Sequence, residues 1–182
     1  VIYPLKNQTN GAAEYMTLGE ALEAHQLTVT EVDKDGSVPE LQVLNRADKA
    51  VLLIDGEELI GAKQNRVLNT TILVPEKQSV VIPVSCTEQG RWSYASDVFS
   101  DSETVMERNI RARKNRSVSE SLEATASYRS DQGEVWDGIA NLEQAAGSAS
   151  QTGAMRDAFE SQRGSLDKAI EAFTPVSGQS GL

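Results

Sequence analysis

Apolar and polar residues alternate through much of residues 27–84, which is the period of half-buried β-strands. We predict strands over 27–32, 39–46, 50–55, 57–61, 66–74 and 79–84. The continuous apolar run at 50–54 favours burial on both faces. Asp55-Gly56 tolerates positive φ and predicts a tight hairpin that places 57–61 beside 50–54. The loop "PEKQ" predicts a second hairpin between the strands that flank it.

A helical period replaces this alternation from about residue 101. We predict a partly irregular surface helix over 101–129, capped by Asp101 or Ser102, and a helix over 131–147 with Asp131 and Glu134 at capping spacing. A last helix, over 152–173, starts at Thr152 and carries one apolar face, and a short helix follows Thr17. The face of the last helix consists of Met155, Phe159, Leu166, Ile170 and Phe173.

These elements predict an α+β fold. A sheet-rich N-terminal half, about residues 27–95, packs against a helical C-terminal half, about residues 101–173. The chain has 182 residues and is 39% apolar, which suits one domain spanning 1–182 with a sizeable core. Its net charge of −10 argues against general DNA binding and against attraction to anionic membranes, since both need a positive field.

Cysteine and histidine usage narrows the chemistry. Cys86 is the single cysteine, so it cannot form an internal disulfide, and a reducing, cytoplasmic location fits best. We expect Cys86 to be a small buried residue at a strand end. With one histidine, His25, a zinc site of the usual type is excluded, and we predict no metal site. The sequence does not identify a cofactor and leaves open whether the protein is an enzyme.

A dense polar block interrupts the strand region in "DGEELIGAKQNR". Alternation fails at Gly61-Ala62, where the backbone is able to bulge and re-aim the side chains that follow. One hypothesis is an anion site in which Lys63 and Arg66 bind the charge. Glu57 and Glu58 are acid/base candidates, but adjacent strand residues point to opposite faces, so at most one of them joins the pocket, and Glu58 is the one included in the site. Gln64, Asn65 and Asn69 supply directional hydrogen bonds. The alternative is an exposed strand edge that charges protect from aggregation.

Three further segments carry candidate residues, each with a plain structural alternative. Glu88, Arg91 and Trp92 lie in the loop "SCTEQGRWSY", where Trp92 is either a stacking surface or a core residue. Gln132 lies at a helix start, where free N–H groups favour binding of an anion. The alternative is that the polar residues there only cap the helix. We expect Trp136 to pack behind Gln132. Arg108 and Arg111 lie one turn apart in a basic run that binds an anion or forms a solvated face.

The sequence resembles a known family at these same residues. "DGEELIGAKQNRVLNTTILVPEKQSVVIPVSCTEQGRW", "YRSDQGEVWDGIA" and "AFTPVSGQSG" resemble the prokaryotic ARG and rhodanese-phosphatase-superfamily-associated protein domain. The resemblance covers about residues 3–180. It implies a role in a bacterial or archaeal system that handles ADP-ribose-like or phosphorylated molecules, and implies no particular reaction. The family pattern continues past "GQxG", which predicts that this chain lacks the last part of its domain.

Two function hypotheses follow. In the first, the protein binds a small anionic ligand, nucleotide-like or ADP-ribose-like, in one polar pocket. That pocket gathers Glu58, Lys63, Gln64, Asn65, Arg66, Asn69, Glu88, Arg91, Trp92, Gln132 and Trp136. In the second, the protein is a non-enzymatic interaction module that binds a partner protein through its helical half.

Overall fold

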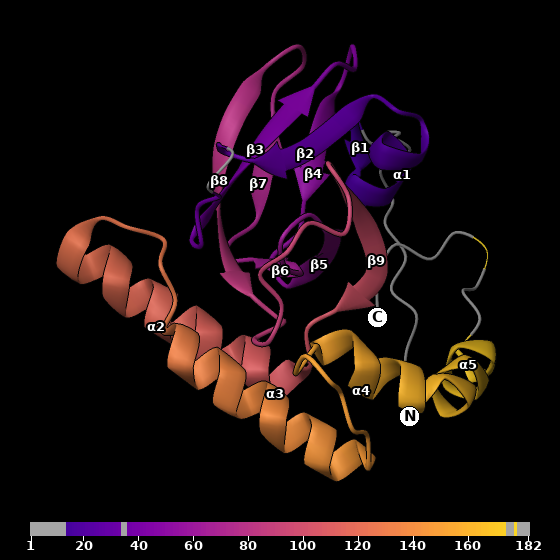
Figure 1. Ribbon diagram of the computed structural model, residues 1–182. Coiled ribbons are helices and arrows are strands. Elements are labelled where there is room, and N and C mark those ends of the chain that lie inside the picture. The colour runs from indigo at the N-terminus through magenta and orange to yellow at the C-terminus, as the bar shows by residue number, and fades with distance from the viewer. Residues whose placement is uncertain (1–13, 34–35, 174–176, 178–182) are drawn as a thin grey trace.

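The computed structural model describes residues 14–33, 36–173 and 177. The closing segment quoted for the family resemblance lies largely outside them. Strands fill the first part and helices the second, so the α+β prediction is confirmed (Figure 1). The strands are β1 (Tyr15–Thr17), β2 (Leu27–Glu31), β3 (Glu40–Asn45), β4 (Ala50–Leu53), β5 (Glu57–Gly61), β6 (Arg66–Leu68), β7 (Ile72–Val74), β8 (Ser79–Cys86) and β9 (Phe99–Val105). The helices are α1 (Leu18–Glu23), α2 (Arg108–Thr125), α3 (Gln132–Ala146), α4 (Met155–Ser161) and α5 (Arg163–Ala172).

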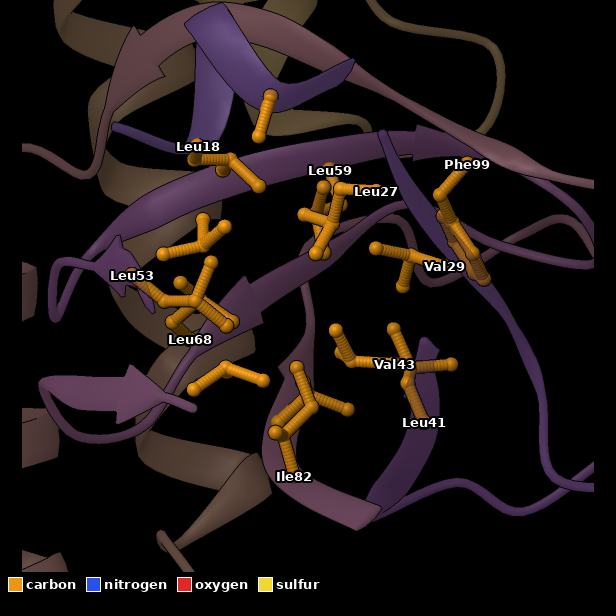
Figure 2. Packing of buried hydrophobic residues seen from close by; sticks show 14 of the residues in the cluster. Leu18, Leu27, Val29, Leu41, Val43, Leu53, Leu59, Leu68, Ile82 and Phe99 are labelled. Atoms are coloured by element: carbon orange, nitrogen blue, oxygen red, sulfur yellow. The ribbon is translucent and has the colours of Figure 1, made fainter. Parts of the chain in front are cut away.

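The strands form two sheets with a shared core. Six strands lie in the order β2-β3-β8-β6-β5-β9, and every neighbouring pair is antiparallel. The smaller sheet has the order β1-β4-β7, with β1 parallel to β4. Alternation along β2 and β3 turns Leu27, Val29, Leu41 and Val43 into one apolar cluster (Figure 2). Leu53 of the smaller sheet joins the same cluster.

The helices α2, α3 and α4 lie beneath the larger sheet (Figure 1). A second apolar cluster joins them to β6 through Val67, Ile110, Val135, Ile139 and Met155. The predicted caps explain two helix starts. Thr17 and Glu20 form a capping box, and the Asp131 side chain accepts from the Glu134 N–H at 3.0 Å.

The Asp55-Gly56 hairpin prediction is wrong. Gly56 has the expected positive φ of 87°, but β4 and β5 belong to different sheets. The turn is held by the helical layer, because α2 binds the Asp55 side chain through Arg111, Lys114 and Asn115. The second predicted hairpin is confirmed in part, because its first strand is divided: β6 pairs antiparallel with β8, whereas β7 pairs with β4. Nor is β4 buried on both faces, because its burial alternates.

The predicted helix start at Asp101 or Ser102 is wrong as well. Residues 99–105 form β9 against β5, and α2 begins at Arg108 with Glu107 as its cap. The last helix is divided into α4 and α5, and Thr152 caps neither. Its apolar face is only half covered: Met155 is buried, whereas Ile170 is 71% and Phe173 60% exposed.

Candidate functional site

The backbone bends at the point where alternation fails in the sequence. Gly61 has φ 126° and Ala62 has φ 40°, both in the left-handed region, and β5 ends there. After this bend Lys63, Gln64 and Asn65 are between 6% and 9% exposed, and Arg66 is fully buried. The exposed-edge interpretation of this block is therefore wrong, because its polar side chains turn into the protein.

Arg66 is the most deeply buried charge of this block. Its Nη1 donates to Gln64 Oε1 at 2.9 Å and to Cys86 Sγ at 3.0 Å. Its Nη2 lies 3.8 Å from Glu31 Oε1, which is beyond hydrogen-bond distance. The Nε and Nη2 atoms, which form one edge of the guanidinium, have no hydrogen-bond partner. A charged donor pair is thus left unsatisfied inside the protein.

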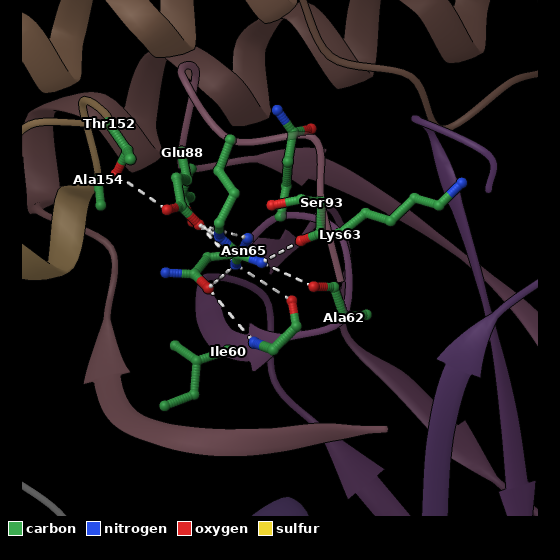
Figure 3. Close-up of polar contacts among 12 residues, drawn as sticks. Ile60, Ala62, Lys63, Asn65, Glu88, Ser93, Thr152 and Ala154 are labelled. Atoms are coloured by element: carbon green, nitrogen blue, oxygen red, sulfur yellow. Dashed lines mark hydrogen bonds and ion pairs between the residues drawn. The ribbon is translucent and has the colours of Figure 1, made fainter. Parts of the chain in front are cut away.

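Arg91 fixes the bend by binding both Glu88 and Asn65, which lie side by side in Figure 3. It donates to Glu88 Oε2 at 2.7 Å, to the Ala62 carbonyl at 2.6 Å and to Asn65 Oδ1 at 3.1 Å. Glu88 also accepts from the Asn65 N–H at 3.2 Å and from the Thr152 hydroxyl at 2.9 Å. Burial opposes ionisation of Glu88, but the hydrogen bonds from Arg91 and Thr152 outweigh it and lower its pKa. Glu88 therefore stays charged and holds three segments together.

Gln132 connects the helical layer to Cys86. Its side chain accepts from the Cys86 N–H at 2.8 Å and donates to the Cys86 carbonyl at 2.9 Å, in the manner of a neighbouring strand. Cys86 is buried as predicted, and burial raises the pKa of its thiol. A protonated, enclosed thiol is a poor nucleophile. The arrangement positions Gln64 and Arg66 and gives no sign of cysteine catalysis.

Three of the sequence candidates make no hydrogen bond or ion pair with Arg66: Glu58, Asn69 and Trp136. Glu58 pairs with Val67 in the β5–β6 register, so it lies on the opposite face of the sheet from Arg66. There it accepts from the Thr87 hydroxyl at 2.6 Å, and burial raises its pKa to about 7. Asn69 donates to the Tyr128 carbonyl at 2.9 Å. Trp136 lies on α3 with its buried Nε1 unpartnered.

The loop after β8 places two half-exposed aromatic rings above this cluster. Trp92 is 49% and Tyr94 51% exposed, so the interpretation of Trp92 as a core residue is wrong. The Lys63 ammonium lies 5.2 Å from both ring centroids, and Arg66 Cζ lies 5.8 Å from the Trp92 ring. Beside them an open depression of about 500 Å³ is lined by Glu31, Asp33, Tyr94 and Asp97.

The ARG and Rhodanese-Phosphatase-superfamily-associated Protein domain matches residues 1–182. The chain belongs to this family. No curated protein and no solved structure matches it. Among the described residues, no helix has the length and apolar character needed to cross a membrane, and no group of three or more potential ligands could hold a metal ion.

Sequence reasoning missed several residues that complete this family member's polar cluster. Glu31 ends β2 with its side chain inward. The sequence indicated this, because Glu31 continues the every-second-residue pattern of the inward-facing Leu27 and Val29. Thr152 was interpreted only as a cap, although it binds Glu88. Arg111 of the basic run donates to Asp55 at 2.8 Å, so it is engaged within the fold. Arg108 takes no part in that contact.

Proposed function

We propose that the protein binds a small anionic ligand of the nucleotide or ADP-ribose class at the Arg66 cluster. One observation carries this proposal: Arg66 is fully buried, yet its Nε and Nη2 donors have no partner. Burying an unsatisfied charged donor costs on the order of 1–3 kcal/mol or more. Two oxygens of a phosphate or carboxylate match this edge of a guanidinium in bidentate geometry. A ligand anion would supply the missing acceptors.

The charge balance supports an anion. Lys63, Arg66 and Arg91 oppose Glu31 and Glu88 around the guanidinium and leave a charge of +1 there, whereas Asp33 and Asp97 make the adjoining depression acidic. Glu31 is the competing anion, because its Oε1 lies 3.8 Å from Nη2 and its Oε2 has no partner. It also lines the depression, into which it would turn when a ligand binds.

The aromatic rings narrow the ligand class. Trp92 is half exposed and adjacent to Arg66, so a nucleobase would stack on it while an anionic group reaches the guanidinium. Asp33 and Asp97 in the depression would accept hydrogen bonds from ribose hydroxyls. A base, a ribose and an anionic group together describe a nucleotide. The free thiol of Cys86 fits a prokaryotic cytoplasm as the setting.

Ligand titrations test this proposal. Trp92 must rotate to admit a group to Arg66, so its fluorescence reports binding once Trp136 is replaced by phenylalanine. We expect ADP-ribose or AMP to change that fluorescence and to raise the melting temperature, because a ligand at about 100 times its Kd stabilises by about 2.7 kcal/mol. Trp92→Ala should abolish the rise in melting temperature. Phe173→Ala, which removes an equally exposed ring elsewhere, should retain it.

The Glu31→Gln variant tests whether the bound ligand is an anion. Removing the competing carboxylate should tighten binding of an anion by several-fold, whereas Asp48→Asn, at an exposed carboxylate outside the cluster, should leave it unchanged. No response to ADP-ribose, AMP, ADP or inorganic phosphate, in either assay, would refute the proposal. Weaker anion binding in Glu31→Gln would refute the role of Arg66.

A second candidate function is protein binding through the helical half. The exposed Leu166, Ile170 and Phe173 on and next to α5 favour it, because apolar groups gathered on a surface helix mark interaction sites. The test is capture of a partner protein by the wild-type chain and its loss with Ile170→Glu. Capture that survives this change would contradict the role of α5.

A further inference from the structure

A second pocket lies away from the Arg66 cluster. It has a volume of about 320 Å³ and opens between α2, the β6–β7 loop and the connection from α2 to α3. None of the residues from Lys63 to Arg66 lines it. Its size is at the lower end of the range for small-molecule pockets, about 300–1,000 Å³. We call it the α2 pocket.

Hydrogen bonds fix the walls of the α2 pocket. Lys114, with no exposed surface, donates to Asp55 Oδ1 at 2.5 Å and to the Leu68 and Asn69 carbonyls at 3.0 and 3.2 Å. These three acceptors use all three N–H groups of an ammonium. Asn69 in turn donates to the Tyr128 carbonyl at 2.9 Å. The β6–β7 loop, α2 and the connection are therefore tied together before any ligand arrives.

The one carboxylate in the pocket is already neutralised. Asp55 accepts from Lys114, from Arg111 Nε at 2.8 Å and from Asn115 Nδ2 at 2.8 Å. Burial opposes its ionisation, but these bonds outweigh it and lower its pKa. Because cations surround it on the protein side, Asp55 offers no free charge to a ligand. The pocket therefore favours an uncharged guest.

Two polar groups with unused hydrogen-bonding capacity belong to residues that line this pocket. Asn115 Oδ1 is buried and has no partner. The orientation of this amide is fixed, because the Asp55 carboxylate accepts only and so must face Nδ2. Thr71 Oγ1 accepts from the Asp55 N–H at 3.1 Å, which leaves its hydroxyl hydrogen to donate. An acceptor on α2 and a donor on the β6–β7 loop together match a hydroxyl group, which both donates and accepts.

Apolar groups share the α2 wall with Asn115. Val118 and Leu122 lie four residues apart on α2 and so share one face, and Tyr128 adds a ring that is 44% exposed. We propose that the α2 pocket binds a neutral sugar, with its C–H face against Leu122 and Tyr128 and a hydroxyl donating to Asn115 Oδ1. This site is independent of the anion site at Arg66.

Saturation-transfer NMR on the full chain tests this site with D-glucose, D-ribose, N-acetylglucosamine and glycerol as probes. We expect transfer to at least one sugar, with a Kd in the millimolar range, and stronger transfer to ring C–H protons than to glycerol. Ser119→Trp fills the pocket from an exposed position and should reduce the signal at least tenfold. Glu120→Trp is the matched control on an exposed position that does not line the pocket, and should retain it.

Asn115→Leu separates the proposed hydrogen bond from pocket shape, and should also lower transfer at least tenfold. Urea denaturation and circular dichroism confirm that each variant is folded, and a misfolded Asn115→Leu leaves the decision to the Ser119→Trp and Glu120→Trp pair. No transfer to any sugar would overturn the site. Transfer that persists in Ser119→Trp, or that is lost only in Trp92→Ala, would also overturn it.

Discussion

Glu58 is expected to make the folded protein less stable as the pH rises from 5 to 8. The carboxyl has no exposed surface, one oxygen accepts from Thr87, and the other has no partner. Burial raises its pKa from 4.5 to about 7, against the hydrogen bonds from Thr87 and Ser102 that lower it. Nearby, Arg156 favours its ionisation and Glu88 opposes it.

The sign follows from proton binding. Between pH 4.5 and 7 the unfolded chain has released this proton while the folded chain still holds it, so the free energy of unfolding falls with rising pH. Each pKa unit is worth about 1.36 kcal/mol, and the shift from 4.5 to about 7 therefore amounts to about 3 kcal/mol in full. Integrated from pH 5 to 8, the loss is about 2.5 kcal/mol.

Glu58→Gln isolates this loss. Glutamine keeps the acceptor for Thr87 and cannot ionise, and all other titrating groups are common to both proteins. Urea denaturation of wild type and variant at pH 5, 6, 7 and 8 gives the difference in unfolding free energy. We expect the unfolding free energy of the variant minus that of wild type to rise by about 2–3 kcal/mol from pH 5 to pH 8. Parallel pH profiles for the two proteins would refute the reasoning.

The remaining predictions concern stability and reactivity. Lys114→Met should lower the free energy of unfolding by about 3 kcal/mol in urea titrations, since it leaves the largely buried Asp55 without its main partner; a loss under 1 kcal/mol would contradict this. Cys86 should resist a thiol reagent in the folded protein and react fully in denaturant, because burial raises its thiol pKa. Ile139→Ala should cost about 2–5 kcal/mol and Ile170→Ala under about 1 kcal/mol, because Ile139 is buried and Ile170 is 71% exposed; similar losses would contradict the exposure of α5.

Sequence patterns predicted elements more reliably than their partners. The Thr17 and Asp131 caps and the inward faces of β2 and β3 depend on neighbours a few residues away, and these were confirmed. Strand pairing depends on distant segments. Gly56 adopts the turn conformation that Asp55-Gly56 indicates, yet α2 captures Asp55 and β5 continues into the other sheet. Residues 101–105 were assigned to a helix, but they pair with β5 as part of β9.

The candidate site shows the same limit at the level of single side chains. The failure of alternation at Gly61-Ala62 correctly located a bend, but the sequence left open which way the polar residues turn. They turn inward because Arg91 and Glu88 hold the bend, and Glu31, at the end of the earlier strand β2, faces Arg66. A protein that needed only a stable core would gain by replacing such charges with apolar groups of similar volume. The retention of a buried guanidinium with an open edge is therefore the feature that most needs a ligand to explain it.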